Sequence, residues 1–250
     1  YPHSTPKPVW TKVDSIPPSF LPHEVHDEHN GEEDEGEDGS RARGLSTWPI
    51  ILVCYPAGMD TKLIGSETVA EGTVRFVFER PEGFTYAAGQ SVDLTLVKPP
   101  ETDGLGNMRP FTLSSSPDDD HLAITTRMRD TAFKRTLAAM APGTAMKVDG
   151  PFGELVLPES ADRDIVFLAG GIGITPFYAM SRYAAAHALP HRIALFYANR
   201  TPESAAFLTE LAELPNPNFS FIPTMTRVDT AWSGERGHVD SALLARPLHA

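Results

Sequence analysis

Cysteine is nearly absent from this chain of 250 residues. The single residue, Cys54, excludes an internal disulfide framework, a zinc site built from cysteines and an iron–sulfur cluster held by cysteines of this chain. Long apolar runs are absent too: the longest, around 49–54 and 165–169, fall far short of the roughly 18 residues that a membrane span requires. A basic start followed by an apolar stretch, as in a signal peptide, is also missing. We therefore expect a globular, cytoplasmic protein with no membrane span.

Positive charge is scarce, since 21 Lys and Arg face 33 Asp and Glu and the net charge is −12. Such a balance argues against nucleic-acid binding, which needs clustered cations for the phosphates. Nine of the acidic residues lie between Glu24 and Asp38, and without them the net charge would be −3. We predict a disordered acidic segment at 1–48, because it has too few apolar residues to form a core, and a linker or extra strand at 49–60. No metal site is predicted, since we interpret three histidines of the acidic segment as solvated: His23, His26 and His29.

Residues 61–153 have the pattern of an all-β antiparallel barrel. Thr73–Glu79 and Ser91–Val97 alternate apolar and polar residues with the period of two that half-buried strands show. Turn residues recur about every ten positions, which is typical of a barrel or sandwich of short strands. The other predicted elements are the strands Phe111–Ser114, Leu122–Thr126 and Ala145–Val148 and one helix, Thr131–Met140, with Phe133 and Leu137 on its apolar face.

After Gly150 the pattern changes to alternating strands and helices. Asp164–Ala169 is an apolar run followed by glycines, as expected of a parallel strand that is buried on both faces. The order strand, helix, strand, helix, strand is that of an open parallel sheet covered by helices. We therefore predict an α/β nucleotide-binding domain at 154–250, with further strands at Arg192–Tyr197 and Asn218–Pro223 and helices at Pro176–Ala188 and Glu203–Leu214.

A glycine-rich segment, Gly170-Gly171-Ile172-Gly173-Ile174-Thr175-Pro176, joins the first parallel strand to its helix. Glycines there let the backbone approach a phosphate closely, and the start of the helix offers N–H groups and a positive dipole end. Thr175 is predicted to cap the helix, with Pro176 at its first position. A tight turn without a ligand is the alternative. The position at the carboxyl end of a parallel strand, where ligands bind in such folds, favours the binding site.

A second segment, Arg109 to Pro117, places a guanidinium, an aromatic ring and a hydroxyl along one predicted strand. We expect Arg109, Phe111 and Thr112 to lie on one side and to meet one ligand. An arginine suits a phosphate, and a ring can stack on an aromatic cofactor. Taken alone, the segment would fit better as an exposed arginine beside a core phenylalanine in a serine-rich turn.

Together, the two segments resemble the ferredoxin–NADP reductase superfamily, in which a flavin-binding antiparallel barrel precedes a nicotinamide-nucleotide-binding α/β domain. The family's barrel motif, Arg-x-(Tyr/Phe)-(Ser/Thr), is matched by Arg109, Phe111 and Thr112. Its pyrophosphate loop, Gly-Gly-x-Gly-x-(Thr/Ser)-Pro, is matched by Gly170 to Pro176, and Gly150-Pro151-Phe152-Gly153 stands at the usual junction. The resemblance covers about 61–240.

The resemblance implies two cofactors, a flavin (FAD, with FMN as the alternative) and NADP(H) or NAD(H). Thr112 would lie near flavin N5, the atom that receives hydride, and is the predicted catalytic residue. Gly89 and Gln90 also match the family, and we expect them to shape the fold rather than to contact a ligand. The predicted flavin-binding residues are Arg109, Pro110, Phe111, Thr112, Thr125, Thr126, Arg127, Thr131 and Ala132. The predicted nucleotide-binding residues are Gly170, Gly171, Gly173, Thr175, Pro176 and Arg200.

Arg200 follows the second parallel strand, where specificity for the nucleotide is usually set. No carboxylate stands at the end of that strand, and a cation favours the 2′-phosphate, so NADP(H) is favoured. Glu203, three residues on, is interpreted as an acid at a helix N-terminus.

The predicted activity is that of an NAD(P)H-dependent flavin oxidoreductase that passes electrons to an acceptor which the sequence does not identify. Members of the family continue beyond this sequence with a further strand, a helix and a last strand, so we expect the α/β domain to be incomplete at its C-terminus. A flavin-binding electron-transfer subunit that needs a partner is the second hypothesis. A non-catalytic protein that binds a basic partner through its acidic segment is the third.

Overall fold

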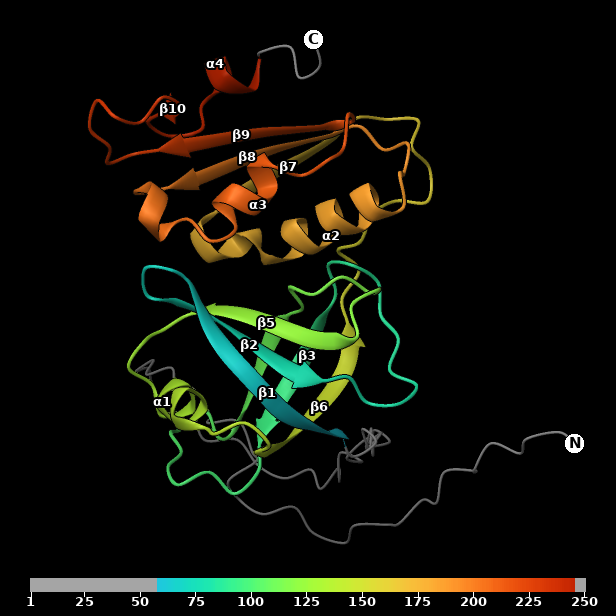
Figure 1. Ribbon diagram of the computed structural model, residues 1–250, viewed down its shortest axis with the longest axis vertical. Coiled ribbons are helices and arrows are strands. Elements are labelled where there is room, and N and C mark those ends of the chain that lie inside the picture. The colour runs from blue at the N-terminus through green and yellow to red at the C-terminus, as the bar shows by residue number, and fades with distance from the viewer. Residues whose placement is uncertain (1–57, 246–250) are drawn as a thin grey trace, which may run out of the picture. The chain divides into compact units, whose positions relative to one another are not determined.

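The computed structural model of the protein describes residues 58–245 (Figure 1). The predicted acidic segment 1–48 and residues 49–57 of the predicted linker or extra strand lie outside the described residues. The last positions of that predicted linker belong to β1 (Met59–Ala70), the first strand of the barrel. The sequence does not predict β1, because polar and exposed residues interrupt the alternation of apolar and polar residues around Gly65.

Six antiparallel strands form the first sheet, in the order β4-β3-β6-β1-β2-β5. The two outer strands meet through a bridge between Leu113 and Ile124 and through the hydrogen bond that Ser114 N donates to Ala123 O, 2.8 Å. The sheet thereby closes into the predicted barrel. Its remaining strands are β2 (Thr73–Glu79), β3 (Ser91–Leu96), β4 (Met108–Thr112), β5 (His121–Arg127) and β6 (Ala145–Phe152).

The core of the barrel follows from the alternation in its strands. Phe76 and Phe78 of β2 and Leu94 of β3 are at most 2% exposed, and each buried side chain of this size contributes about 1.5–3 kcal/mol relative to exposure. The helix α1 (Ala132–Ala139) adds Phe133 and Leu137 to the same core, as its spacing predicted.

Four parallel strands form the second sheet, in the order β10-β9-β8-β7. The long helix α2 and the short α3 cover one face, and α4 lies on the other, against Phe196 (Figure 1). The strands are β7 (Ile165–Gly170), β8 (Ile193–Asn199), β9 (Phe219–Met225) and β10 (Glu235–Arg236), and the helical segments are η2 (Gly171–Ile174), α2 (Thr175–Ala186), η3 (Pro202–Ser204), α3 (Leu208–Ala212) and α4 (Ser241–Leu244).

Two predictions for this domain need correction. β7 is not buried on both faces: Val166 and Leu168 are 45% and 54% exposed, because β7 is the edge strand and nothing in residues 58–245 covers its outer face. The predicted helix Glu203–Leu214 is two short pieces, η3 and α3, because Ala205 is extended and Phe207 has a left-handed backbone. β8, in contrast, is buried on both faces.

The junction between barrel and α/β domain is held by Gly89 and Gln90. Gln90 Nε2 donates to Gly153 O, 3.0 Å. Gly89 has a φ of +102°, and a Cβ there would lie 2.1 Å from the carbonyl oxygen of Leu155, so this backbone approach requires glycine. Both residues therefore shape the fold, as predicted. Within residues 58–245, no helix is long and apolar enough to cross a membrane, and no group of three or more His, Cys, Asp and Glu side chains could hold a metal ion.

Candidate nucleotide and flavin sites

The glycine-rich segment forms a tight turn at the carboxyl end of β7. Gly170 ends the strand, and Gly171 begins the 3₁₀ turn η2 with a φ of +51°. Thr175 is not the helix cap that the sequence predicted: it is the first residue of α2, and its hydroxyl donates to Ile172 O, 3.3 Å. The helical path begins at Gly171, five residues before the predicted helix start at Pro176.

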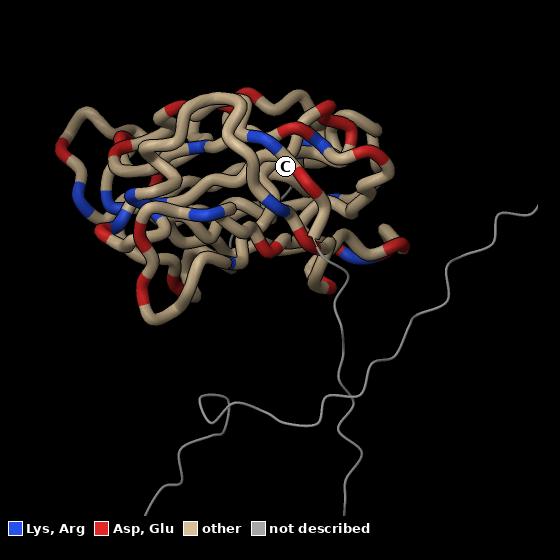
Figure 2. Tube along the Cα trace, turned by 90° about the horizontal axis from the view of Figure 1, so that it is seen from below, with Lys and Arg blue, Asp and Glu red and all other residues tan. Residues whose placement is uncertain are grey.

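A hollow of about 440 Å³ opens directly beside this turn. The carboxyl ends of β7, β8 and β9 line it, together with the end of β5 from the barrel. The lining residues are Arg127, Arg129, Gly170, Gly171, Ile172, Ala198, Asn199, Arg200, Ser204, Thr226 and His238. We call this hollow the nucleotide groove. Figure 2 shows Lys and Arg interspersed with Asp and Glu along the chain, so the arginines of the groove are a local cluster on a molecule of mixed charge.

Parallel pairing brings the arginines of the two strand ends together. Asn199 of β8 is opposite Met225 of β9, and beyond them Arg227 N donates to Arg200 O, 2.7 Å. A second hollow of about 410 Å³ shares Arg127, Arg200 and Ser204 with the groove and adds Arg227. Within residues 58–245, Arg200 and Arg227 form no ion pair with a carboxylate.

The donor set of the groove fits phosphates. Guanidinium groups and hydroxyls bind phosphate oxygens well, and a helical start adds backbone N–H groups and a favourable dipole. Arg127 Nε is buried and has no hydrogen-bond partner in the described part of the chain. Arg127 also lies close to the turn, because a Cβ on Gly171 would be 3.7 Å from its Nη2. A bound anion would satisfy that buried donor.

Arg109, the predicted ligand of the flavin phosphate, is held by the loop that precedes β4. Its Nη2 donates to Asp103 Oδ1, 2.6 Å, and its Nη1 donates to the carbonyl oxygens of Leu105, Gly106 and Met108. The guanidinium also lies 5.3 Å from the ring centroid of Phe133. In the described residues Nε makes no hydrogen bond, so the edge formed by Nε and Nη2 keeps donors for a phosphate. The fit is therefore acceptable, but Asp103 competes with that phosphate for Nη2.

The other residues of the barrel motif are partly arranged as predicted. The Phe111 ring is half-buried, 5.8 Å from that of Phe133. Arg109 and Phe111 are two residues apart on β4 and share a face. Thr112 directly follows Phe111 as the last residue of the strand, so its side chain projects to the other face. The expectation that all three lie on one side is wrong for Thr112. Pro110, between them, is exposed.

The remaining predicted flavin residues lie on β5 and at the start of α1. The Thr125 hydroxyl is buried and lies 2.9 Å from that of Ser114, and Thr126 is 6% exposed. Thr131 caps α1, with its hydroxyl accepting from Lys134 N, 3.3 Å. Ala132 is the buried first residue of that helix. Of these predictions, only Arg127 lines the nucleotide groove.

Three of the predicted nucleotide residues, Gly170, Gly171 and Arg200, line the groove together, and Arg127, which the sequence assigned to the flavin, lines it with them. The groove lining does not include the other three predicted nucleotide residues, Gly173, Thr175 and Pro176. Sequence reasoning missed five residues of the groove, namely Arg129, Asn199, Ser204, Thr226 and His238. It also missed Arg227 of the second hollow. The rule that selected Arg200 could have found Thr226 and Arg227, because they follow the next parallel strand.

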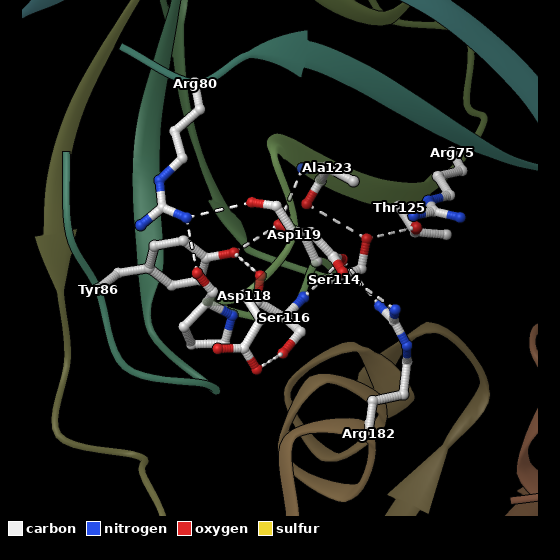
Figure 3. A network of polar contacts seen from close by, with 12 residues as sticks. Arg75, Arg80, Tyr86, Ser114, Ser116, Asp118, Asp119, Ala123, Thr125 and Arg182 are labelled. Carbon is white, nitrogen blue, oxygen red and sulfur yellow. Dashed lines mark hydrogen bonds and ion pairs between the residues drawn. The ribbon is translucent and has the colours of Figure 1, made fainter. Parts of the chain in front are cut away.

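A network of polar contacts lies between α2 and the loop from Ser114 to Asp120, which connects β4 with β5 (Figure 3). Arg182 of α2 binds Asp119 through two hydrogen bonds, 2.9 and 3.1 Å. Burial would raise the pKa of Asp119, but hydrogen bonds from Arg182 and from the Ser116 N–H hold that pKa below its ordinary value. Burial raises the pKa of Tyr86 to about 12, so its phenol stays protonated and donates to Ser116 O, 2.7 Å.

Comparison with known proteins finds an oxidoreductase domain and reductase subunits that are similar to this chain. The family model of the oxidoreductase NAD-binding domain matches residues 167–249. The phthalate 4,5-dioxygenase reductase subunit of Pseudomonas putida is 33% identical over 162 residues, which are 62% of this chain and 48% of that protein. The glycine betaine monooxygenase reductase subunit of Chromohalobacter salexigens is 31% identical over 187 residues, 71% of this chain and 50% of that protein. The chain spans about half the length of these two relatives.

One solved structure is similar to this chain in both sequence and fold. The ferredoxin NADP+ reductase of Neisseria gonorrhoeae, with bound FAD and NADP, is 26% identical, with a TM-score of 0.64 and coverage of 76% of each chain. The antiparallel barrel and the parallel α/β sheet of this chain match the fold of the Neisseria gonorrhoeae reductase. The chain carries an oxidoreductase NAD-binding domain, and it is similar to flavoprotein reductases of the ferredoxin–NADP reductase kind, the family that its two motifs resemble.

Proposed function

We propose that this protein is an NAD(P)H-dependent flavin oxidoreductase. The observation that carries the proposal is the nucleotide groove itself: a glycine turn at the carboxyl ends of parallel strands, with Arg127 supplied by the barrel. A nicotinamide nucleotide in this groove would lie against the domain that carries the flavin motif. The domains we propose are a flavin-binding barrel at 61–153 and a nucleotide-binding domain at 154–250.

Bound flavin would accept a hydride from the nicotinamide at N5 and release the electrons to an acceptor. The side chains of this protein bind and orient the two cofactors. We assign the flavin phosphate to the free edge of Arg109 and one side of the ring system to Phe111. The Thr112 hydroxyl would donate a hydrogen bond near N5. FAD is the proposed flavin, because the Neisseria gonorrhoeae reductase binds it, and FMN is the alternative.

NADP(H) is the proposed nucleotide. Arg200 and Arg227 stand side by side at the strand ends, with the Ser204 hydroxyl in the same hollow. Two cations and a hydroxyl suit a 2′-phosphate, whereas a ribose 2′-hydroxyl is usually recognised by a carboxylate. Of the acids nearby, Glu71 lines the same hollow as the two arginines but forms no ion pair with either in residues 58–245. Glu203 lines a separate hollow of about 310 Å³ and occupies the first turn of η3.

We propose a protein acceptor, of the oxygenase or ferredoxin kind, because the relatives in Pseudomonas putida and Chromohalobacter salexigens are reductase subunits of a dioxygenase and a monooxygenase. The second candidate is a reductase subunit that needs its partner for activity. The exposed outer face of β7, at Val166 and Leu168, favours it, since exposed apolar side chains on an edge strand suit a contact with another polypeptide.

The test is the visible absorption of the purified chain, saturated with FAD or FMN, before and after anaerobic NADPH or NADH. Flavin bands that bleach faster with NADPH than with NADH would support the proposal. Bands that persist with both nucleotides would favour the partner-dependent subunit. A chain that retains neither flavin would contradict the roles of Arg109, Phe111 and Thr112.

A further inference from the structure

The ion pair between Arg182 and Asp119 joins α2, which follows the glycine turn, to the loop between β4 and β5 (Figure 3). Arg182 lies on α2, seven residues after Thr175, so about 10 Å of helix separates it from the glycine turn. Asp119 lies in the loop that leaves the flavin strand β4 after Thr112 and enters β5, which ends at Arg127. Each partner is therefore fixed in sequence to one of the two sites.

The loop of Asp119 is rigidly held on the barrel side. Asp119 Oδ2 accepts from Ser116 N, 2.9 Å. Arg80 Nη1 donates to the carbonyl oxygens of Pro117 and Asp119, 2.6 and 3.1 Å. The Tyr86 hydroxyl lies 2.8 Å from that of Ser115. The carboxylate thus has little freedom to follow a movement of its partner.

The guanidinium of Arg182 is held equally well on the α2 side. It lies over the ring of Tyr178, 5.5 Å from the centroid. That ring stacks on Phe207, with centroids 3.8 Å apart and planes 6° from parallel. Phe207 lies three residues after Ser204 in the chain, and Ser204 lines the nucleotide groove. Arg182 is therefore tied to the α/β domain at both the helix and the segment that follows Arg200.

We propose that Asp119 and Arg182 are positioning residues, which set the place of the nicotinamide against the flavin by fixing α2 to the loop after β4. This inference rests on the proposed function. The Arg182 side chain is 31% exposed and that of Asp119 is 27% exposed, and two charge-assisted hydrogen bonds fix both distance and angle. A neighbouring pair, His187 and Asp118, joins the same helix to the same loop with a single contact, 2.8 Å, and is more exposed at 43% and 48%. It lacks the geometry to fix an angle.

The physical consequence is a loss of rate rather than of binding. Neither residue lines the nucleotide groove or belongs to the flavin motif. Loss of the pair leaves the contacts of each cofactor intact but frees α2 to shift against the barrel. A displacement of about 1 Å at the reacting atoms can cost about 100-fold in rate. We expect the rate of flavin bleaching by NADPH to decrease about 10- to 100-fold in D119N and in R182Q. The rate of R182K should lie between the rates of these variants and that of the wild type.

The experiment combines rapid anaerobic mixing with binding measurements on the full chain. The variants are D119N, R182Q, R182K, the double variant D119N/R182Q and the control D118N. Flavin affinity is measured by fluorescence, NADP+ affinity by calorimetry, and folding by thermal unfolding. The change that NADP+ causes in the flavin spectrum is a second readout, which reports how the rings lie without any turnover.

We expect both affinities to stay within about threefold of the wild type in every variant. We expect the bleaching rate and the spectral change to fall in each single variant, with the double variant no worse than the worse single one. D118N should match the wild type. If D119N and R182Q bleach as fast as D118N and keep the spectral change, the inference is wrong. Independent, multiplying losses in the double variant would also overturn it, because the two residues would not act as a pair.

The failure of the proposed function would look different. A wild-type chain that bound neither flavin nor NADP+ would overturn the proposed function, and the pair would have no cofactors to position. A wild-type chain that bound flavin and NADP+ but did not bleach would still show the change that NADP+ causes in the flavin spectrum. Loss of this spectral change in D119N would support the inference, and its retention would overturn it.

Discussion

Replacing Arg227 or Arg200 with glutamine tests the nucleotide preference most directly. Both side chains are exposed beside the groove, so each charge-assisted contact with a 2′-phosphate is expected at the low end of its range, about 1.5 kcal/mol. Since about 1.4 kcal/mol is a factor of ten, R227Q and R200Q should each raise the KM for NADPH about tenfold. The double variant should raise it about 30-fold rather than 100-fold, because neighbours that share one phosphate are not additive.

The assay compares steady-state reduction of an artificial acceptor with NADPH and with NADH. The KM for NADH should change less than twofold, because NADH has no 2′-phosphate. R192Q is the matched control: Arg192 is an exposed arginine that precedes β8 and binds Asp164 away from the groove. Equal increases of KM for NADPH and NADH in R227Q would refute the reasoning, and so would an increase in R192Q as large as that in R227Q.

Three further predictions concern the loop at Arg109, the junction glycine and the ion pair. D103N should tighten FMN binding several-fold, because the Asp103 carboxylate competes with the phosphate for Arg109. In a fluorescence titration, riboflavin, which has no phosphate, should bind both proteins equally. In a urea titration, G89A should destabilise the fold by at least about 2 kcal/mol, since the new Cβ would lie 2.1 Å from Leu155 O. The control G83A, also at positive φ but with no atom within 4 Å of its Cβ, should cost about 1 kcal/mol. Folding lowers the pKa of Asp119, so its ion pair stabilises the protein above the unfolded pKa of about 3.9, and this contribution is lost as pH falls below that value. In urea unfolding, D119N should have a lower free energy of unfolding than the wild type at pH 7, and the difference should shrink below about pH 4. A difference that stays constant with pH would contradict this account.

Local sequence patterns determined the two domains and most of their elements. The alternation of Thr73–Glu79 places β2 at the observed residues, and the four-residue spacing of Phe133 and Leu137 predicts the buried side of α1. The glycine turn and the Arg-x-Phe-Thr segment were sufficient to indicate the superfamily. These features depend on neighbours in the chain, because backbone conformation and side-chain alternation are local properties.

Predictions failed where a distant part of the chain decides the environment. β7 reads as a strand buried on both faces, but burial depends on the order of strands in the sheet, and β7 lies at the edge. The helix predicted from Glu203 is interrupted where Phe207 turns to stack on Tyr178 of α2. The sequence singled out Arg109 but not Asp103, which holds its guanidinium through a loop that has no periodic pattern.

The sequence by itself determined which chemical groups the protein offers, namely a glycine turn, a motif arginine and an arginine after a parallel strand. Only the tertiary structure decided which of them meet. Arg127 comes from the barrel and Arg200 and Arg227 come from two strand ends, yet all three line the second hollow, beside the nucleotide groove. Asp119 and Arg182, 63 residues apart, pair because the loop after β4 packs against α2. Such contacts depend on how whole sheets and helices pack, which no short stretch of sequence specifies.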